Sequence, residues 1–147
     1  MSLRDSDIEP TYNEIEISCV NIALEAQEKT NNKIDCVVAL SRGGIIAASM
    51  ISHMIEGCDV VFMDYTTTEV LNLPPKVFHY KNILVIDDIA NTGKRMSDMQ
   101  TLFGVYDFDS VTYSVLYKNQ KEFVGDIDIV ARSIISDSKV VFPWMCA

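Results

Sequence analysis

The sequence lacks several features that mark large classes of proteins. It has no apolar run near the ~20 residues of a membrane-spanning helix, and no apolar signal segment lies near its N-terminus. Its four cysteines form no Cys-x-x-Cys pair and show no Cys/His spacing of a zinc site. We therefore expect a cytoplasmic protein with no membrane partner, whose cysteines are reduced and mostly buried: Cys19, Cys36, Cys58 and Cys146.

Basic residues are scarce as well. The chain carries 12 lysines and arginines against 21 aspartates and glutamates, which gives a formal net charge of -9 at pH 7. A protein that grips the nucleic-acid backbone has the opposite balance, so we expect no nucleic-acid partner. With 147 residues, of which 48% are hydrophobic, the chain is long enough for one well-buried core and too short for two comfortable domains.

The apolar pattern predicts helices that alternate with buried strands. Apolar residues at helical spacing predict helices over residues 11–29, 45–57 and 93–104, and a Thr-x-x-Glu capping box begins the first. Short continuous apolar runs, typical of strands covered on both faces, lie at residues 34–40, 58–65, 82–86 and 110–117. The alternation predicts an α/β fold: a single domain with an open, mostly parallel twisted sheet flanked by helices.

Two segments interrupt this alternation. Residues 65–81 contain Pro74 and Pro75 and cannot form one regular element, because proline removes a backbone donor and restricts the residue before it. Such a long connection is either a lid or binding loop, or a plain crossover or edge hairpin, and the sequence leaves both open. The C-terminal residues 138–147 are strand-like until Pro143.

Two polar segments that contain glycine follow predicted strands. Residues 41–44 read Ser-Arg-Gly-Gly, and residues 87–95 read Asp-Asp-Ile-Ala-Asn-Thr-Gly-Lys-Arg. In an open parallel sheet, ligands bind beyond the carboxyl ends of the strands. We therefore expect both segments to lie at one ligand-binding edge.

The second segment has the composition of a phosphate-binding loop. A turn that leads into a helix offers unpaired backbone N–H groups, and Gly93 lets the backbone approach a ligand without a Cβ in the way. Thr92 adds a hydroxyl donor, and Lys94 and Arg95 add positive charge. The segment is not a Walker loop, because only one glycine precedes the lysine.

Asp87 and Asp88 stand one loop length from these phosphate-binding groups. Their carboxylates can accept hydrogen bonds from vicinal hydroxyls or face Mg²⁺, so the predicted ligand carries both a phosphate and a diol, as a ribose 5-phosphate unit does. The alternative is that the two acids cap the following helix and pair with Lys94 or Arg95. In the other segment, Arg42 and the glycine N–H groups suit a second anion such as pyrophosphate, or form only a plain Gly-Gly turn.

The stretch VVALSRGGIIAA, followed later in the chain by ILVIDDIANTGKR, resembles the type I phosphoribosyltransferases. The resemblance covers about residues 34–144. The sequence is most similar to the hypoxanthine, xanthine and guanine phosphoribosyltransferases, whose base-binding segments resemble VLYK at 115–118 and VVFPW at 140–144. The resemblance implies a core at about residues 33–118. It also implies a small base-binding hood that is built from C-terminal and N-terminal segments, and the C-terminal segment is at about residues 119–147.

The resemblance also implies an activity, a cofactor and partners. The reaction is reversible phosphoribosyl transfer between 5-phosphoribosyl 1-pyrophosphate and a purine-type nucleobase, which gives a nucleoside 5′-monophosphate and pyrophosphate. The implied cofactor is Mg²⁺, and family members are commonly homodimers or homotetramers.

The family's functional positions can be carried over to this sequence. Asp87 and Asp88 then hold the ribose hydroxyls, directly or as Mg²⁺ ligands, and act in catalysis with Asn91. The implied 5′-phosphate site is Ala90, Asn91, Thr92, Gly93, Lys94 and Arg95. The implied pyrophosphate loop, which often contains a non-proline cis peptide in this family, is Ser41, Arg42, Gly43 and Gly44. The implied base-binding residues are Lys118, Lys139, Val140 and Trp144.

Two of these positions depart from the family pattern. Asn91 stands where the related enzymes usually have an aspartate, the proposed proton acceptor for the base, and an asparagine cannot take that proton at neutral pH. Lys139 stands where an aromatic residue normally stacks on the purine, and Tyr65 with Thr66 only weakly resembles the family's lid. A second hypothesis is therefore a non-catalytic protein of this fold that binds phosphoribosyl pyrophosphate or a nucleotide and regulates a partner. A third is an unrelated doubly wound nucleotide binder.

Overall fold

The computed structural model describes residues 7–63, 72–120, 123, 125–135, 137 and 139–145. Within them the chain forms three α-helices: α1 (Tyr12–Thr30), α2 (Arg42–Met54) and α3 (Lys94–Gly104). It also forms five strands: β1 (Cys36–Ala39), β2 (Asp59–Phe62), β3 (Asn82–Ala90), β4 (Ser110–Asn119) and β5 (Ile129–Ile134). A short 3₁₀-helix, Pro75–His79, precedes β3.

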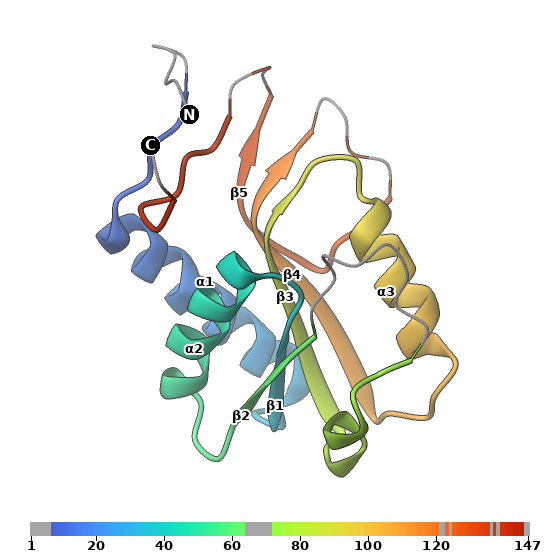
Figure 1. Cartoon of the computed structure of the whole chain (residues 1–147). Helices are drawn as coiled ribbons and strands as arrows, with labels where there is room; N and C mark the ends of the chain where they lie inside the picture. The colour runs from blue at the N-terminus through green and yellow to red at the C-terminus, as the bar shows by residue number, and fades with distance from the viewer. Residues whose placement is uncertain are drawn as a thin grey trace.

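The five strands form one parallel sheet in the order β2-β1-β3-β4-β5. Helices α1 and α2 lie on one face of the sheet and α3 lies on the other (Figure 1). The predicted α/β class, with an open parallel sheet flanked by helices, is confirmed. The strand order reverses between β1 and β3, so this fold has its topological switch point there, where ligands of such sheets bind.

The core consists of two apolar layers that the sheet separates. Strand β1 has four fully buried residues, which explains why its sequence is a continuous apolar run rather than an alternating one. Its Val37 packs in the layer under α1 and α2, and its Val38 packs in the layer under α3. Each such side chain contributes about 1.5–3 kcal/mol by leaving water, so both faces hold the central strands in place.

The predicted capping box at the start of α1 is confirmed. Thr11 Oγ1 accepts a hydrogen bond from the Glu14 N–H at 3.1 Å, and Glu14 Oε1 accepts one from the Thr11 N–H at 3.2 Å. The helix ends at Asn31, whose left-handed conformation (φ 53°) turns the chain back so that the Asn32 N–H donates to the Gln27 carbonyl oxygen at 2.8 Å. Local sequence signals therefore define both ends of α1.

Strand β3 is longer than its apolar run predicted. The run ends at Ile86, but the strand continues to Ala90 and pairs with β4 as far as Lys118. Asp87 and Asp88 therefore lie inside the strand, not in the loop after it. Aspartate is uncommon in strands, which is why the sequence did not reveal this extension.

Strand β5 was not predicted. It lies within residues 119–147, the range that the family resemblance assigned to the C-terminal hood, and it pairs with β4 at the edge of the main sheet. Arg132 and Ser133 interrupt its apolar character, because an edge strand can leave side chains exposed.

The two irregular segments are described only in part. Of the connection 65–81, residues 72–81 are described and include the 3₁₀-helix, whereas the suggested lid pair Tyr65 and Thr66 lies outside the described residues. Of the C-terminal residues, Val140 forms an isolated parallel bridge with Ile8, and residues 139–145 make no longer ladder.

The described cysteines are unpaired, as expected. Cys19 and Cys36 are buried and Cys58 is half-buried, and Cys146 lies outside the described residues. Burial raises the pKa of Cys19 and Cys36 to about 12 and that of Cys58 to about 11, so these thiols stay protonated and inert. No helix in the described residues is long and apolar enough to cross a bilayer.

Candidate functional site

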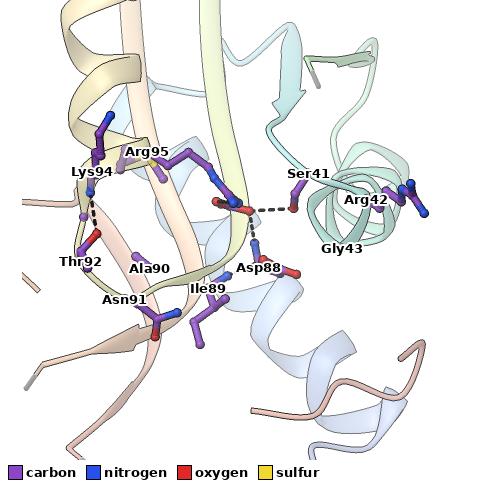
Figure 2. Close-up of a pocket in the computed structure, with 13 residues that line it drawn as sticks. Ser41, Arg42, Gly43, Asp88, Ile89, Ala90, Asn91, Thr92, Lys94 and Arg95 are labelled. Atoms are coloured by element: carbon purple, nitrogen blue, oxygen red, sulfur yellow. Dashed lines mark hydrogen bonds and ion pairs between the residues drawn. The ribbon is translucent and has the colours of Figure 1, made fainter. Parts of the chain in front are cut away.

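Two strand-to-helix corners meet at the switch point of the sheet. One corner joins β1 to α2, and the other joins β3 to α3. Because β1 and β3 are adjacent and parallel, their carboxyl ends bring both corners to the same edge. Residues 41–43 from the first corner and 87–96 from the second line one cavity of about 480 Å³ (Figure 2).

The first corner is shaped by Ser41 and two glycines. Ser41 is the N-cap of α2, and its Oγ accepts a hydrogen bond from the Gly44 N–H at 3.0 Å. A Cβ on Gly43 would lie 2.0 Å from Asp88 Oδ2, and one on Gly44 would lie 3.1 Å from the Ile86 carbonyl oxygen. The glycines therefore let the first turn of α2 approach β3, a packing role that leaves both the pyrophosphate loop and the plain Gly-Gly turn open.

The second corner has an open helix N-terminus. Gly93 is the N-cap of α3 in a left-handed conformation (φ 84°), which a residue with a Cβ adopts at a cost. Among the described residues no side chain caps this helix, and the Lys94 N–H lies 3.4 Å from Thr92 Oγ1. The alternative that Asp87 and Asp88 cap α3 is wrong, because Gly93 is its N-cap, and the first residues of the helix line the cavity.

Asp87 has three hydrogen-bond partners among the described residues. Its carboxylate is 3% exposed, and Oδ1 accepts hydrogen bonds from Ser41 Oγ at 2.8 Å and from the Asp88 N–H at 2.9 Å. Oδ2 lies 2.8 Å from Arg95 Nη1 in an ion pair (Figure 2). The salt-bridge part of the alternative hypothesis is thus correct for Arg95.

Asp88 lies in a different environment, although it is also buried. Its Oδ1 accepts a hydrogen bond from the Ile89 N–H at 2.8 Å, and its Oδ2 lies against Gly43. Burial, followed by the charge of Asp87 and a hydrogen bond to it, raises the pKa of Asp88 from 3.8 to about 7, against the smaller lowering effects of Ile89 and Arg95. A nearby cation would favour the ionised form of this carboxylate.

The cationic side chains come from both corners. Arg42 is exposed, and its guanidinium group points away from the carboxylates (Figure 2). Lys94 lines the cavity, while its Nζ lies 2.9 Å from Asp98 Oδ2 on the outer surface of α3. Of the three, Arg95 is the cation that reaches the carboxylate pair.

The carboxylate pair fits the requirements of Mg²⁺ only together with a ligand. No group of three or more His, Cys, Asp or Glu side chains in the described part of the chain could hold a metal ion. Mg²⁺ usually keeps several waters and binds through one or two carboxylates plus substrate phosphates, so an aspartate of this pair would hold it only together with a bound phosphate group.

The four predicted base-binding residues lie outside this cavity. Lys118 stands opposite Ala90 on β4, and its Nζ lies 4.5 Å from the centroid of the Phe123 ring. Lys139 is exposed, and its N–H donates a hydrogen bond to Asp7 Oδ1 at 3.2 Å.

The other two base-binding positions lie in the same C-terminal segment. Val140 is buried and bridges Ile8. Trp144 is half-buried and stacks on Phe142, with ring centroids 4.7 Å apart and an angle of 4° between the rings. This C-terminal segment therefore makes contacts of its own, and none of these four residues lines the cavity between the corners.

Three residues and one backbone feature of the cavity differ from the expectations. Ile89 and Met96 line the cavity but were not predicted; Ile89 directly follows the acid pair, which could have indicated it. Gly44 points its N–H to Ser41 and does not line the cavity, unlike Ser41, Arg42 and Gly43. The cis peptide expected at residues 41–44 is absent, since no described peptide bond is cis.

Comparison with known proteins identifies the fold. The sequence matches no known protein-family model. The purine phosphoribosyltransferase of Pyrococcus horikoshii superimposes with a TM-score of 0.78 at 18% identity, over 96% of this chain and 95% of that chain. The xanthine-guanine-hypoxanthine phosphoribosyltransferase of Helicobacter pylori gives a TM-score of 0.78 at 16% identity, over 94% and 92% of the two chains.

A third solved structure adds a ligand. A protein of Neisseria gonorrhoeae with bound ppGpp superimposes with a TM-score of 0.73 at 19% identity, over 97% of this chain and 92% of that chain. The chain therefore has the fold of the purine phosphoribosyltransferases, as the sequence resemblance predicted.

Proposed function

We propose that this protein binds a 5-phosphoribosyl ligand in the cavity between the two corners and transfers the phosphoribosyl group. The transfer runs between 5-phosphoribosyl 1-pyrophosphate and a purine-type base, and gives a nucleoside 5′-monophosphate and pyrophosphate. One observation carries the proposal: residues 41–43 and 87–96, far apart in sequence, line a single cavity at the switch point of the sheet.

The two corners suit the two anionic ends of such a ligand. The open N-terminus of α3, with Gly93 and Thr92, suits the 5′-phosphate, because its backbone N–H groups and helix dipole favour an anion. The N-terminus of α2, with the exposed Arg42, suits the pyrophosphate. Asp88 lies between them, where it can accept hydrogen bonds from the ribose hydroxyls.

This arrangement supports the transfer in two ways. Holding both ends of the ligand fixes C1 of the ribose against the incoming base. The translational and rotational entropy of bringing the two reactants together is then lost on binding and not in the chemical step. The buried carboxylates stabilise the positive charge that develops on the ribosyl group. Mg²⁺, when bound, would neutralise charge on the leaving pyrophosphate.

A second candidate function rests on Asn91. This exposed amide lines the cavity at the position where the related enzymes usually carry an acid, and it cannot accept a proton from the base. Loss of a general base typically lowers a rate by ~10²–10⁴. The second candidate is therefore a protein that binds phosphoribosyl pyrophosphate or a nucleotide for regulation.

One experiment separates the two functions. The protein is incubated with Mg²⁺, phosphoribosyl pyrophosphate and one base at a time: hypoxanthine, guanine, xanthine, adenine, orotate or uracil. Release of pyrophosphate together with a purine nucleotide is the expected result. Ligand binding without product favours the regulatory function, and turnover of orotate or uracil alone contradicts the purine assignment. The variant Asp88→Asn serves as the control and should bind the ligand more weakly.

A further inference from the structure

The neighbouring carboxylates of Asp87 and Asp88 have different partners. Asp87 accepts hydrogen bonds from three groups, the Ser41 hydroxyl, the Asp88 N–H and the Arg95 guanidinium, at 2.8–2.9 Å. Asp88 accepts one from the adjacent Ile89 N–H and lies with its other oxygen against Gly43. The family resemblance gave both carboxylates the same role, but the contacts of this chain separate them.

The bonds to Asp87 join three elements. Ser41 comes from the corner after β1, the Asp88 N–H from β3 and Arg95 from the first turn of α3. Turning the Asp87 carboxylate toward a ligand would break these bonds and leave a buried charge without its cation, which is strongly unfavourable. The carboxylate of Asp87 is therefore held between the corners.

Arg95 occupies a position that needs an explanation. A cation in the first turn of a helix is disfavoured by the helix dipole. Its guanidinium turns back to β3 instead, where it lies 2.8 Å from Asp87, with side-chain exposures of 39% for Arg95 and 3% for Asp87 (Figure 2). The ion pair offsets two free-energy costs, the repulsion between Arg95 and the helix dipole and the desolvation of the Asp87 carboxylate.

We propose that Arg95 is a positioning residue that gives the two carboxylates different roles. By pairing with Asp87, it keeps this carboxylate as a link between the two corners, and Asp88 alone meets the ribose hydroxyls and the divalent cation. The division of roles rests on the proposed function, since it concerns the same phosphoribosyl ligand.

The first test measures thermal unfolding of Arg95→Gln, Asp87→Asn and the double variant, with Arg132→Gln as the matched control. Arg132 also pairs with a carboxylate, that of Glu14 at 3.9 Å, but both side chains are over two-fifths exposed. Arg95→Gln should lower Tm by roughly 4–8 °C, and the double variant should lose less than the sum of the single losses. Arg132→Gln should lower Tm by less than about 2 °C. Arg95→Lys should restore part of the loss.

The second test measures calorimetric binding of phosphoribosyl pyrophosphate with and without Mg²⁺. Asp88→Asn should reduce the enhancement of affinity by Mg²⁺ about 10- to 100-fold. Asp87→Asn and Arg95→Gln should keep this enhancement, even where the affinity itself falls. If Asp88→Asn keeps the enhancement, Asp88 has a merely structural role, and if Asp87→Asn and Asp88→Asn lose it alike, both acids have the same role. Either result would overturn the proposal.

The results of these two tests distinguish an error in the role of Arg95 from an error in the proposed function. If the wild-type protein binds no phosphoribosyl pyrophosphate, the proposed function is wrong, and the thermal series alone decides the role of Arg95. Equal Tm losses for Arg95→Gln and Arg132→Gln, or strict additivity of Arg95→Gln with Asp87→Asn, would then show that Arg95 does not position Asp87.

Discussion

The two corners of the cavity differ in whether a side chain accepts a hydrogen bond from the backbone N–H groups at the start of the helix. In the β1–α2 corner the Ser41 side chain caps the helix and accepts a hydrogen bond from the Gly44 N–H. In the β3–α3 corner Gly93 begins the helix without a side-chain cap among the described residues. A capped N-terminus keeps its donors occupied, whereas an open one offers them to a ligand. We therefore expect the β3–α3 corner to bind an anion more strongly than the β1–α2 corner.

The largest expected effect concerns the close approach at the first corner. In Gly43→Ala the new Cβ would lie 2.0 Å from Asp88 Oδ2 and force the Asp88 carboxylate out of its position in the cavity. We expect a loss of roughly 2–3 kcal/mol in the free energy of unfolding, measured by urea denaturation, together with loss of ligand binding. Gly104→Ala is the matched control, because no atom lies within 4 Å of the position that its new Cβ would take. Equal stabilities of the two variants would contradict the tight corner.

The second expected effect is a pH dependence of stability caused by Asp88. Its pKa rises from 3.8 in the unfolded chain to about 7 in the folded protein, so the folded state holds the proton more tightly. The protonated Asp88 therefore contributes to the free energy of unfolding, and this contribution is complete below about pH 4. It is lost as the pH rises through about 7, and the free energy of unfolding falls by at most about 1.4 kcal/mol for each pH unit.

The variant Asp88→Asn isolates this contribution. It should be more stable than the wild type at about pH 8, and its advantage should shrink as the pH falls toward about 4. Urea denaturation of both proteins across this range measures the difference. A difference that does not change with pH would show that the carboxylate of Asp88 titrates normally.

The third expected effect tests the open corner. Gly93→Ala places a Cβ on a residue with φ 84°, which costs about 1–2 kcal/mol of stability, and it should also weaken phosphoribosyl pyrophosphate binding. Gly57→Ala is the matched control, since Gly57 also has a positive φ of 71° but lies outside the cavity. Denaturation should show similar losses for both variants, while calorimetry should show weaker binding for Gly93→Ala alone. Unchanged binding in that variant would remove the second corner from the site.

The smallest expected effect tests the capped corner. Ser41→Ala removes the N-cap of α2 and a hydrogen bond to Asp87, and should cost about 1 kcal/mol or slightly more. Thr11→Ala removes a comparable cap from α1, which starts far from the cavity in sequence and does not line it. Thermal unfolding should show similar losses in Tm for the two variants. A lower ligand affinity only in Ser41→Ala would confirm that the capped corner also contributes to binding, and equal affinities would limit it to a structural role.

The sequence predicted those parts of the fold that depend on local signals. The capping box of α1, the buried run of β1 and the glycine before α3 were all readable, because each depends on a few adjacent residues. The extension of β3 through Asp87 was missed, because its polar residues end the apolar run while its pairing to β4 does not appear in the local sequence. Strand β5 was missed for a similar reason, as its exposed Arg132 and Ser133 hide an edge strand.

The site residues show the same division. The segments 41–44 and 87–95 could be assigned to one edge of the sheet from topology alone, and they line one cavity except for Gly44. The sequence left open whether Arg95 pairs with a phosphate or with an aspartate, because the choice depends on where α3 starts relative to β3. The need for glycine at position 43 arises from Asp88, a contact between distant parts of the chain that only the fold reveals.

The central claim is that both corners seat one phosphoribosyl ligand, and backbone amide chemical shifts measure this most directly. With Mg²⁺ present, ribose 5-phosphate should shift the amide signals of residues 90–95, and pyrophosphate should shift those of residues 41–44. Phosphoribosyl pyrophosphate should shift both sets together. Shifts at only one corner, or at neither, with the intact ligand would contradict the account.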